Sequence, residues 1–220
     1  VEVSQSSSVR SNECDVSRRQ LVGELERVEE CFVFSLKMLQ KFFLSPLLKM
    51  CDVNERDRGV LTSPITLFLN AHTTVLQKIK ERIKWWSNSR TALADVIQMV
   101  SAHAGTHLQY LKALPNILKL IHDIRNNALY SSFFTNYKPY MATPLPTTPA
   151  PTAPPPPSSS DNTSSSSDSV PITAEQDLVM YYLAPVYIYW RWYSVVSQLC
   201  IHTPLSHPDA GGLCDVLSVM

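Results

Sequence analysis

Two histidines, His103 and His107, stand four residues apart, the spacing that places two metal ligands on one face of a helix. Gly105 between them weakens a helix, and Ala104 stands where the helical zinc-protease motif carries its glutamate. A zinc site also needs a third ligand, and none is evident nearby. We therefore predict no metal site.

No other combination of residues predicts covalent chemistry. The chain has no nucleophile–histidine–acid arrangement, no phosphate loop and no Cys-x-x-Cys pair. Its five cysteines are odd in number and fit reduced thiols in an intracellular protein better than a disulfide framework. We predict no cofactor, which leaves non-covalent binding as the chemistry to explain.

The most distinctive stretch is an aromatic-rich run from Ala184 to Trp192 with one cation, Arg191, inside it. One interpretation is that Arg191 stacks on its aromatic neighbours, a cation–π contact worth roughly 0.5–2 kcal/mol. The other is an interface hot spot, because tryptophan, tyrosine and arginine are enriched there. We favour the interface.

Long helices must position these residues. Apolar residues recur at steps of three and four along most of the chain, and no segment alternates with a period of two. We expect a first helix from an N-cap at Ser17 to about Met50, and a second from Ser63-Pro64. A third region should begin near Thr91 and be kinked or divided at Pro115, and Thr173 should cap the helix with the aromatic run. The predicted fold is all-α, an elongated bundle.

Residues 135–172 differ in composition from the rest. Ten of the 16 prolines and a long serine-rich stretch lie there or at its edge. Such a segment buries too little apolar surface to offset the entropy of ordering, so we expect a disordered insertion with polyproline II character. The domain organisation that follows is a disordered segment 1–14, a helical part 15–134, the insertion 135–172 and a second helical part 173–220. An SH3-like partner could dock on the proline run, although a plain spacer is favoured.

Charge and hydropathy limit the kinds of partner that the chain could bind. Nineteen acidic residues balance 19 basic ones, so no overall field draws the chain to nucleic acid or anionic lipid. Tyr181–Ile201 is about long enough to span a bilayer, but Arg191 lies at its centre, and we expect a buried helix instead. The chain ends inside an apolar pattern, which suggests a piece of something longer.

Several motifs resemble one family. A first region reads Glu24-Leu25-Glu26-Arg27-Val28-Glu29-Glu30-Cys31-Phe32-Val33, followed by Phe43-Leu44-Ser45-Pro46-Leu47. A second includes Leu67-Phe68-Leu69-Asn70, and a third runs from Ala184 to Val196 and on to His202-Thr203-Pro204. In order and spacing these resemble the Dbl-homology (DH) domain of Rho guanine nucleotide exchange factors, in divergent form and cut short at the C-terminus. The likeness spans about residues 17–134 and 173–220.

The resemblance implies a function and a site. It implies an exchange factor that contacts the switch regions of a Rho-family GTPase and favours its nucleotide-free state. Glu29 would engage switch I and Arg191 switch II, with the GTPase-binding face completed by Glu26, Asn70, Tyr187 and Ile188. It also implies a cytoplasmic protein, with recruitment to membrane or cytoskeleton only through regions outside this chain.

Departures from the family pattern keep other functions open. Tyr187 replaces the usual glutamine, Ile188 the following arginine and Ala184 the preceding lysine. Loss of these polar groups could leave a non-catalytic DH-like scaffold that binds a GTPase or another helical partner. Without the resemblance, Glu29 would be a solvated helix residue, and the chain would be an unrelated helical bundle.

Overall fold

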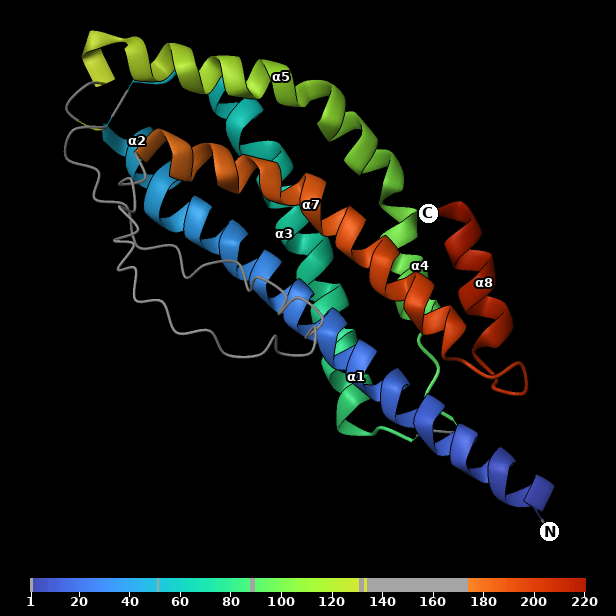
Figure 1. Cartoon of the computed structure of the whole chain (residues 1–220). Helices are drawn as coiled ribbons and strands as arrows, with labels where there is room; N and C mark the ends of the chain where they lie inside the picture. The colour runs from blue at the N-terminus through green and yellow to red at the C-terminus, as the bar shows by residue number, and fades with distance from the viewer. Residues whose placement is uncertain (1, 51, 88–89, 131–132, 134–173) are drawn as a thin grey trace, which may run out of the picture.

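The computed structural model describes residues 2–50, 52–87, 90–130, 133 and 174–220, with side chains from Asp15 onward and, in the last long helix, from Leu178. All regular structure in these ranges is helical (Figure 1). The chain folds into an elongated bundle, as the periodicity predicts. The predicted insertion 135–172 and the cap at Thr173 lie outside the described residues.

The first helix is longer than the sequence predicts. α1 spans Glu2–Met38, so Ser17 lies inside the helix and is not its N-cap. Extending a formed helix is much easier than nucleating one, which is why a polar N-terminal stretch can continue it. A π-helical turn, η1 (Leu39–Leu44), leads into α2 (Ser45–Met50). This wide turn precedes Pro46, whose ring cannot fit a regular helical ladder.

The second long helix also begins earlier than predicted. α3 spans Glu55–Lys84, and the Asn54 side chain caps it by accepting a 2.9 Å hydrogen bond from the Asp57 amide. Glu55 and Asp57 add negative charge to the first turn, where the helix dipole favours it. The predicted start at Ser63-Pro64 is therefore wrong, and Pro64 lies within the helix.

The third region divides at a different residue from the one predicted. α4 spans Ala94–Ala102 and α5 spans Ala104–Asn126, with the break at His103. Pro115 lies inside α5 without dividing it. A single 3-10 turn, η2 (Ala128–Tyr130), follows.

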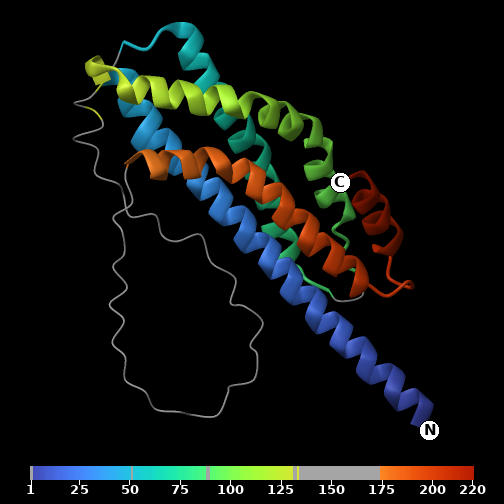
Figure 2. The ribbon, with the colours of Figure 1, turned by 45° about the horizontal axis from the view of Figure 1, so that its top comes forward.

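The last two helices complete the bundle. α7 spans Ala174–Ile201 and carries the aromatic run, and α8 spans Ala210–Val219. α1 contacts both α3 and α7, while α5 lies along α7 (Figures 1 and 2). α8 packs on α4 so closely that a Cβ added at Gly212 would lie 2.7 Å from the Ala94 Cβ. Glycine is thus required there by the approach of the two helices.

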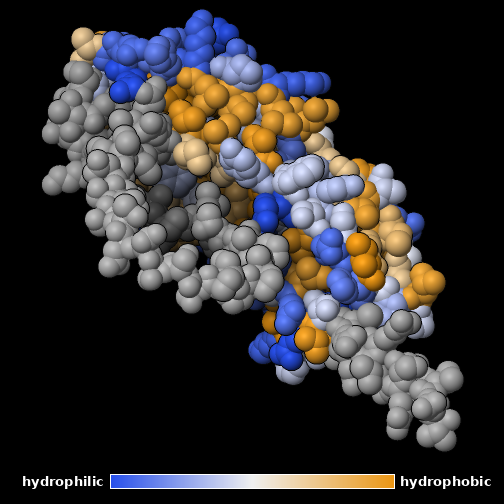
Figure 3. All heavy atoms as spheres, in the orientation of Figure 1, coloured by the Kyte–Doolittle hydropathy of each residue, from blue (hydrophilic) through white to orange (hydrophobic). Residues whose placement is uncertain are grey.

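Large apolar side chains from every long helix fill the core. α7 buries Tyr182, Trp192, Val196 and Leu199 completely, as expected of a core helix. By length and composition alone, one described segment, Asp15–Met50, could cross a membrane, a test that core helices also pass. Figure 3 shows apolar residues gathering on the surface where α5 and α7 lie side by side. The exposed apolar side chains of these two helices include Leu108 and Leu111 on α5 and Met180 on α7.

A buried polar network closes one end of the bundle. The Arg18 guanidinium donates to Asp209 Oδ2 at 2.7 Å, to Thr203 Oγ1 at 3.0 Å and to the Thr91 carbonyl at 3.1 Å. The Asp209 carboxylate also accepts from the amides of Leu93 and Ala94 at the start of α4. Burial lowers the pKa of Arg18, and the Asp209 charge opposes that shift. One ion pair therefore joins α1, the α3–α4 loop and the α7–α8 loop.

Candidate functional site

Glu29 lies in the centre of the bundle, on the same side of α1 as Leu25 and Phe32. Its side chain is 0% exposed. Oε1 accepts a 2.6 Å hydrogen bond from His72 Nδ1 on α3, and Oε2 accepts a 2.8 Å bond from Trp192 Nε1 on α7. Both carboxylate oxygens are thus used inside the protein, where the group joins three helices, and in this structure neither is presented to a partner.

Two buried histidines extend this central network toward α5. His107 Nδ1 donates to the Pro185 carbonyl at 3.1 Å, and its ring lies 5.7 Å from that of His72, with Phe68 against both. Among the described residues, Nε2 of neither histidine has a hydrogen-bond partner. Burial, and secondarily the proximity of His72, lowers the pKa of His107 to about 4. The described residues contain no group of three histidine, cysteine or acidic side chains that could hold a metal ion.

A second carboxylate of α1 lies at the surface. Glu24 Oε1 accepts a 2.8 Å hydrogen bond from the Arg191 guanidinium on α7, and both side chains are about one-third exposed. This ion pair bridges the seam between α1 and α7. Arg191 therefore pairs with a carboxylate rather than stacking on an aromatic ring, since no described cation–π contact involves it.

The other predicted site residues divide between the seam and elsewhere. Tyr187 is 53% exposed, one turn before Arg191. Glu26 is half-buried but lies about 200° around α1 from Glu24, on the side that carries Glu30, which pairs with Lys80 of α3. Ile188 is buried in the core, so its side chain does not reach the surface. Asn70 is exposed, but on α3 rather than on α1 or α7.

Sequence reasoning missed two residues of this arrangement, Trp190 and Glu24. Trp190 is 69% exposed, and its ring stacks on that of Tyr193 with centroids 6.1 Å apart. Tyr187 and Trp190 are three residues apart and share one helix face, a spacing that could have revealed Trp190. Glu24 could have been found from its position five residues before Glu29, about 140° around the helix.

The seam therefore combines an exposed ion pair with exposed aromatic rings. We define the α1–α7 face as Glu24, Tyr187, Trp190 and Arg191. Aromatic and arginine side chains around a polar pair are the composition of a protein-binding surface.

The sequence model of the RhoGEF domain family matches residues 21–220. The match covers almost the entire chain, so this protein belongs to the RhoGEF domain family. A comparison with curated proteins gave no match.

Three solved structures share the fold. The DH domain of FARP2 is 14% identical with a TM-score of 0.68, over 92% of this chain and 84% of that one. The Vav1 exchange factor is 14% identical with a TM-score of 0.66, over 92% and 46%. The DH/PH domains of PDZ-RhoGEF, in complex with activated RhoA, are 10% identical with a TM-score of 0.66, over 94% and 51%. The predicted DH-like, all-α fold is thereby confirmed.

Proposed function

We propose that this protein is a guanine nucleotide exchange factor for a Rho-family GTPase and that it binds the GTPase through the α1–α7 face. Membership of the RhoGEF domain family supports the class of activity. Similarity to a DH/PH structure that was solved with RhoA supports the class of partner. The observation that carries the choice of face is the surface ion pair Glu24–Arg191, flanked by the exposed Tyr187 and Trp190.

Within this proposal, we infer a role for each charged residue from its accessibility. Glu24 takes the acidic role that the sequence suggested for Glu29, because its carboxylate is the accessible one of the two. In the free protein it is held by Arg191, so the two charges are prepositioned and can exchange partners when the GTPase arrives. Exchange requires that these contacts be stronger with the nucleotide-free GTPase than with the nucleotide-bound form.

The test is release of a fluorescent guanine nucleotide from a panel of Rho-family GTPases. We expect acceleration by the wild-type chain and its loss in Arg191→Ala, because the mutation removes the cation that faces the partner. Lys112→Ala is the matched control, an exposed cation on α5 away from the face. Equal activity of both variants on a responsive GTPase would reject the proposed face.

A second candidate function is a non-catalytic scaffold that binds a GTPase without releasing nucleotide. Tyr187 favours it, because an exposed ring stands where the family pattern has a polar glutamine. The scaffold predicts capture of nucleotide-free GTPase in a pull-down with no acceleration of release. An SH3-like partner of the proline-rich segment and a cytoplasmic location remain separate proposals, which such experiments do not address.

A further inference from the structure

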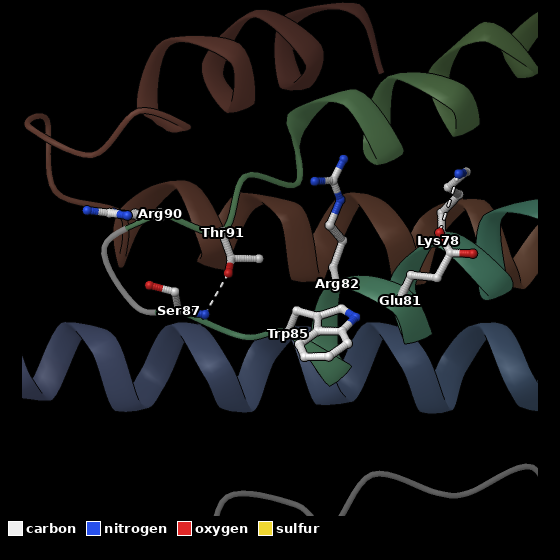
Figure 4. A pocket seen from close by; sticks show the side chains of 7 residues that line it. All are labelled: Lys78, Glu81, Arg82, Trp85, Ser87, Arg90 and Thr91. Carbon is white, nitrogen blue, oxygen red and sulfur yellow. Dashed lines mark hydrogen bonds and ion pairs between the residues drawn. The ribbon is translucent and has the colours of Figure 1, made fainter.

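A hollow of about 580 Å³ lies at the C-terminal end of α3 and shares no residue with the α1–α7 face. Figure 4 shows the side chains that line it: Lys78, Glu81, Arg82, Trp85, Ser87, Arg90 and Thr91. They come from the last turns of α3 and from the loop that leads to α4. The function proposed above uses none of them.

Some of the positive charge here has a local explanation. Arg82 pairs with Asp95 at 2.6 Å, and Lys78 lies 3.4 Å from Glu81. Cations are also favoured in the last turn of any helix, where the dipole is negative, and this accounts for Arg82 and Lys84. These residues alone would indicate only a well-capped helix.

Trp85 and Arg90 are not explained in this way. Trp85 is 77% exposed, although it carries a large apolar surface, and Lys84 Nζ lies over its ring at 5.3 Å. Arg90 lies beyond the helix on an exposed part of the loop, and no described carboxylate pairs with it. An exposed tryptophan flanked by cations is the composition found where proteins meet the headgroup layer of a bilayer.

The local charge has the sign that an anionic bilayer requires. Lys78, Arg82, Lys84 and Arg90 give four positive charges against the two of Glu81 and Asp95, a net charge of +2 in a chain whose overall charge is zero. Figure 4 shows Lys78, Arg82 and Arg90 spread along the hollow rather than converging on one point, with Arg90 at the opposite end from Lys78. This arrangement suits a surface of many headgroups better than a single bound phosphate.

We infer that the α3 tip, defined as Arg82, Lys84, Trp85 and Arg90, docks on anionic phospholipid. Trp85 enters the interfacial layer, and the cations contact the headgroups. This places a membrane contact within the chain, whereas the sequence suggested that any such contact would lie outside it. α3 and α7 pack on α1 separately, and no residue is shared by the α3 tip and the α1–α7 face.

The test is co-sedimentation of the full chain with vesicles of phosphatidylcholine alone or mixed with phosphatidylserine, at low ionic strength. We expect binding only to the mixed vesicles, with loss of binding as salt is added. Arg90→Ala should weaken it about five-fold, the contribution of one cation near an anionic surface. Trp85→Ala should weaken it at least as much and remove the blue shift of tryptophan emission. Lys112→Ala is the control and should bind normally.

Three outcomes would overturn the inference. The first is equal binding of the wild type to both vesicle types, and the second is binding that Trp85→Ala and Arg90→Ala leave unchanged. The third is competition by a soluble inositol phosphate equal to that by vesicles, which would indicate a simple anion site. Nucleotide release in solution should be unchanged in Trp85→Ala, so failure here is distinguishable from failure of the proposed exchange activity.

Discussion

Glu24 and Glu29 belong to the same helix and the same sequence motif, yet they occupy opposite environments. Glu29 is completely buried and holds His72 and Trp192, while Glu24 lies at the surface and pairs with Arg191. The carboxylate in the interior thus joins helices, whereas the one at the surface stays partly accessible to solvent. Position around the helix, rather than the motif alone, decides which role a carboxylate can have.

The largest effect should come from the other buried polar network. Asp209→Ala removes the partner of the buried Arg18 and the acceptor for two α4 amides, which leaves an uncompensated charge in the core. We expect a loss of about 3–5 kcal/mol of unfolding free energy, measured by denaturant titration. Asp215→Ala, at an exposed site on α8, is the control, and equal effects of the two would contradict the assigned network.

A somewhat smaller loss should follow at the centre of the bundle. Glu29→Ala leaves His72 Nδ1–H and Trp192 Nε1–H without their acceptor and opens a cavity, so we expect a loss of about 2–4 kcal/mol. Thermal unfolding followed by circular dichroism would measure it. A Tm unchanged within error would show that Glu29 is not structural.

Acidification should lower the stability of the protein through the same central region. Burial and the proximity of His72 hold the pKa of folded His107 at about 4, below its ordinary value of 6.5, so the folded state binds fewer protons than the unfolded one. The contribution of neutral His107 to the free energy of unfolding is therefore fully present above pH 6.5 and is lost as the pH falls toward 4. At pH 5 the loss should be about 2 kcal/mol. His107→Gln should flatten the stability profile between these values; a profile as steep as that of the wild type would assign the titration to another group.

The smallest stability effect is expected at the surface pair. Glu24→Ala breaks a partly exposed ion pair, and such pairs contribute about 0–1 kcal/mol. Its unfolding curve should nearly overlay that of the wild type. A loss as large as that of Glu29→Ala would remove the distinction between the two carboxylates.

Local sequence patterns predicted the helices better than their ends or the site. Steps of three and four gave the long helices correctly, because apolar periodicity reports the buried face directly. The predicted start at Ser63 was wrong because Asn54 already caps that helix at an earlier position. The predicted start at Ser17 was wrong because the helix begins at Glu2 and runs through it.

The site was only partly predictable. Glu29 follows Leu25 by four residues and precedes Phe32 by three, so periodicity alone places it on the buried side. No local pattern could predict the hydrogen-bond partners of Glu29, because His72 and Trp192 lie on helices that are distant in the sequence. The Arg191–Glu24 pair, separated by 167 positions, likewise required the fold.

The most direct test of the account compares nucleotide release by Glu24→Ala and Glu29→Gln on one responsive GTPase, at a temperature where both variants are folded. We predict that Glu24→Ala loses acceleration while its stability is unchanged. Glu29→Gln should keep acceleration in proportion to its folded fraction, because its side chain does not reach the partner. Full activity of Glu24→Ala together with an inactive but folded Glu29→Gln would contradict the account.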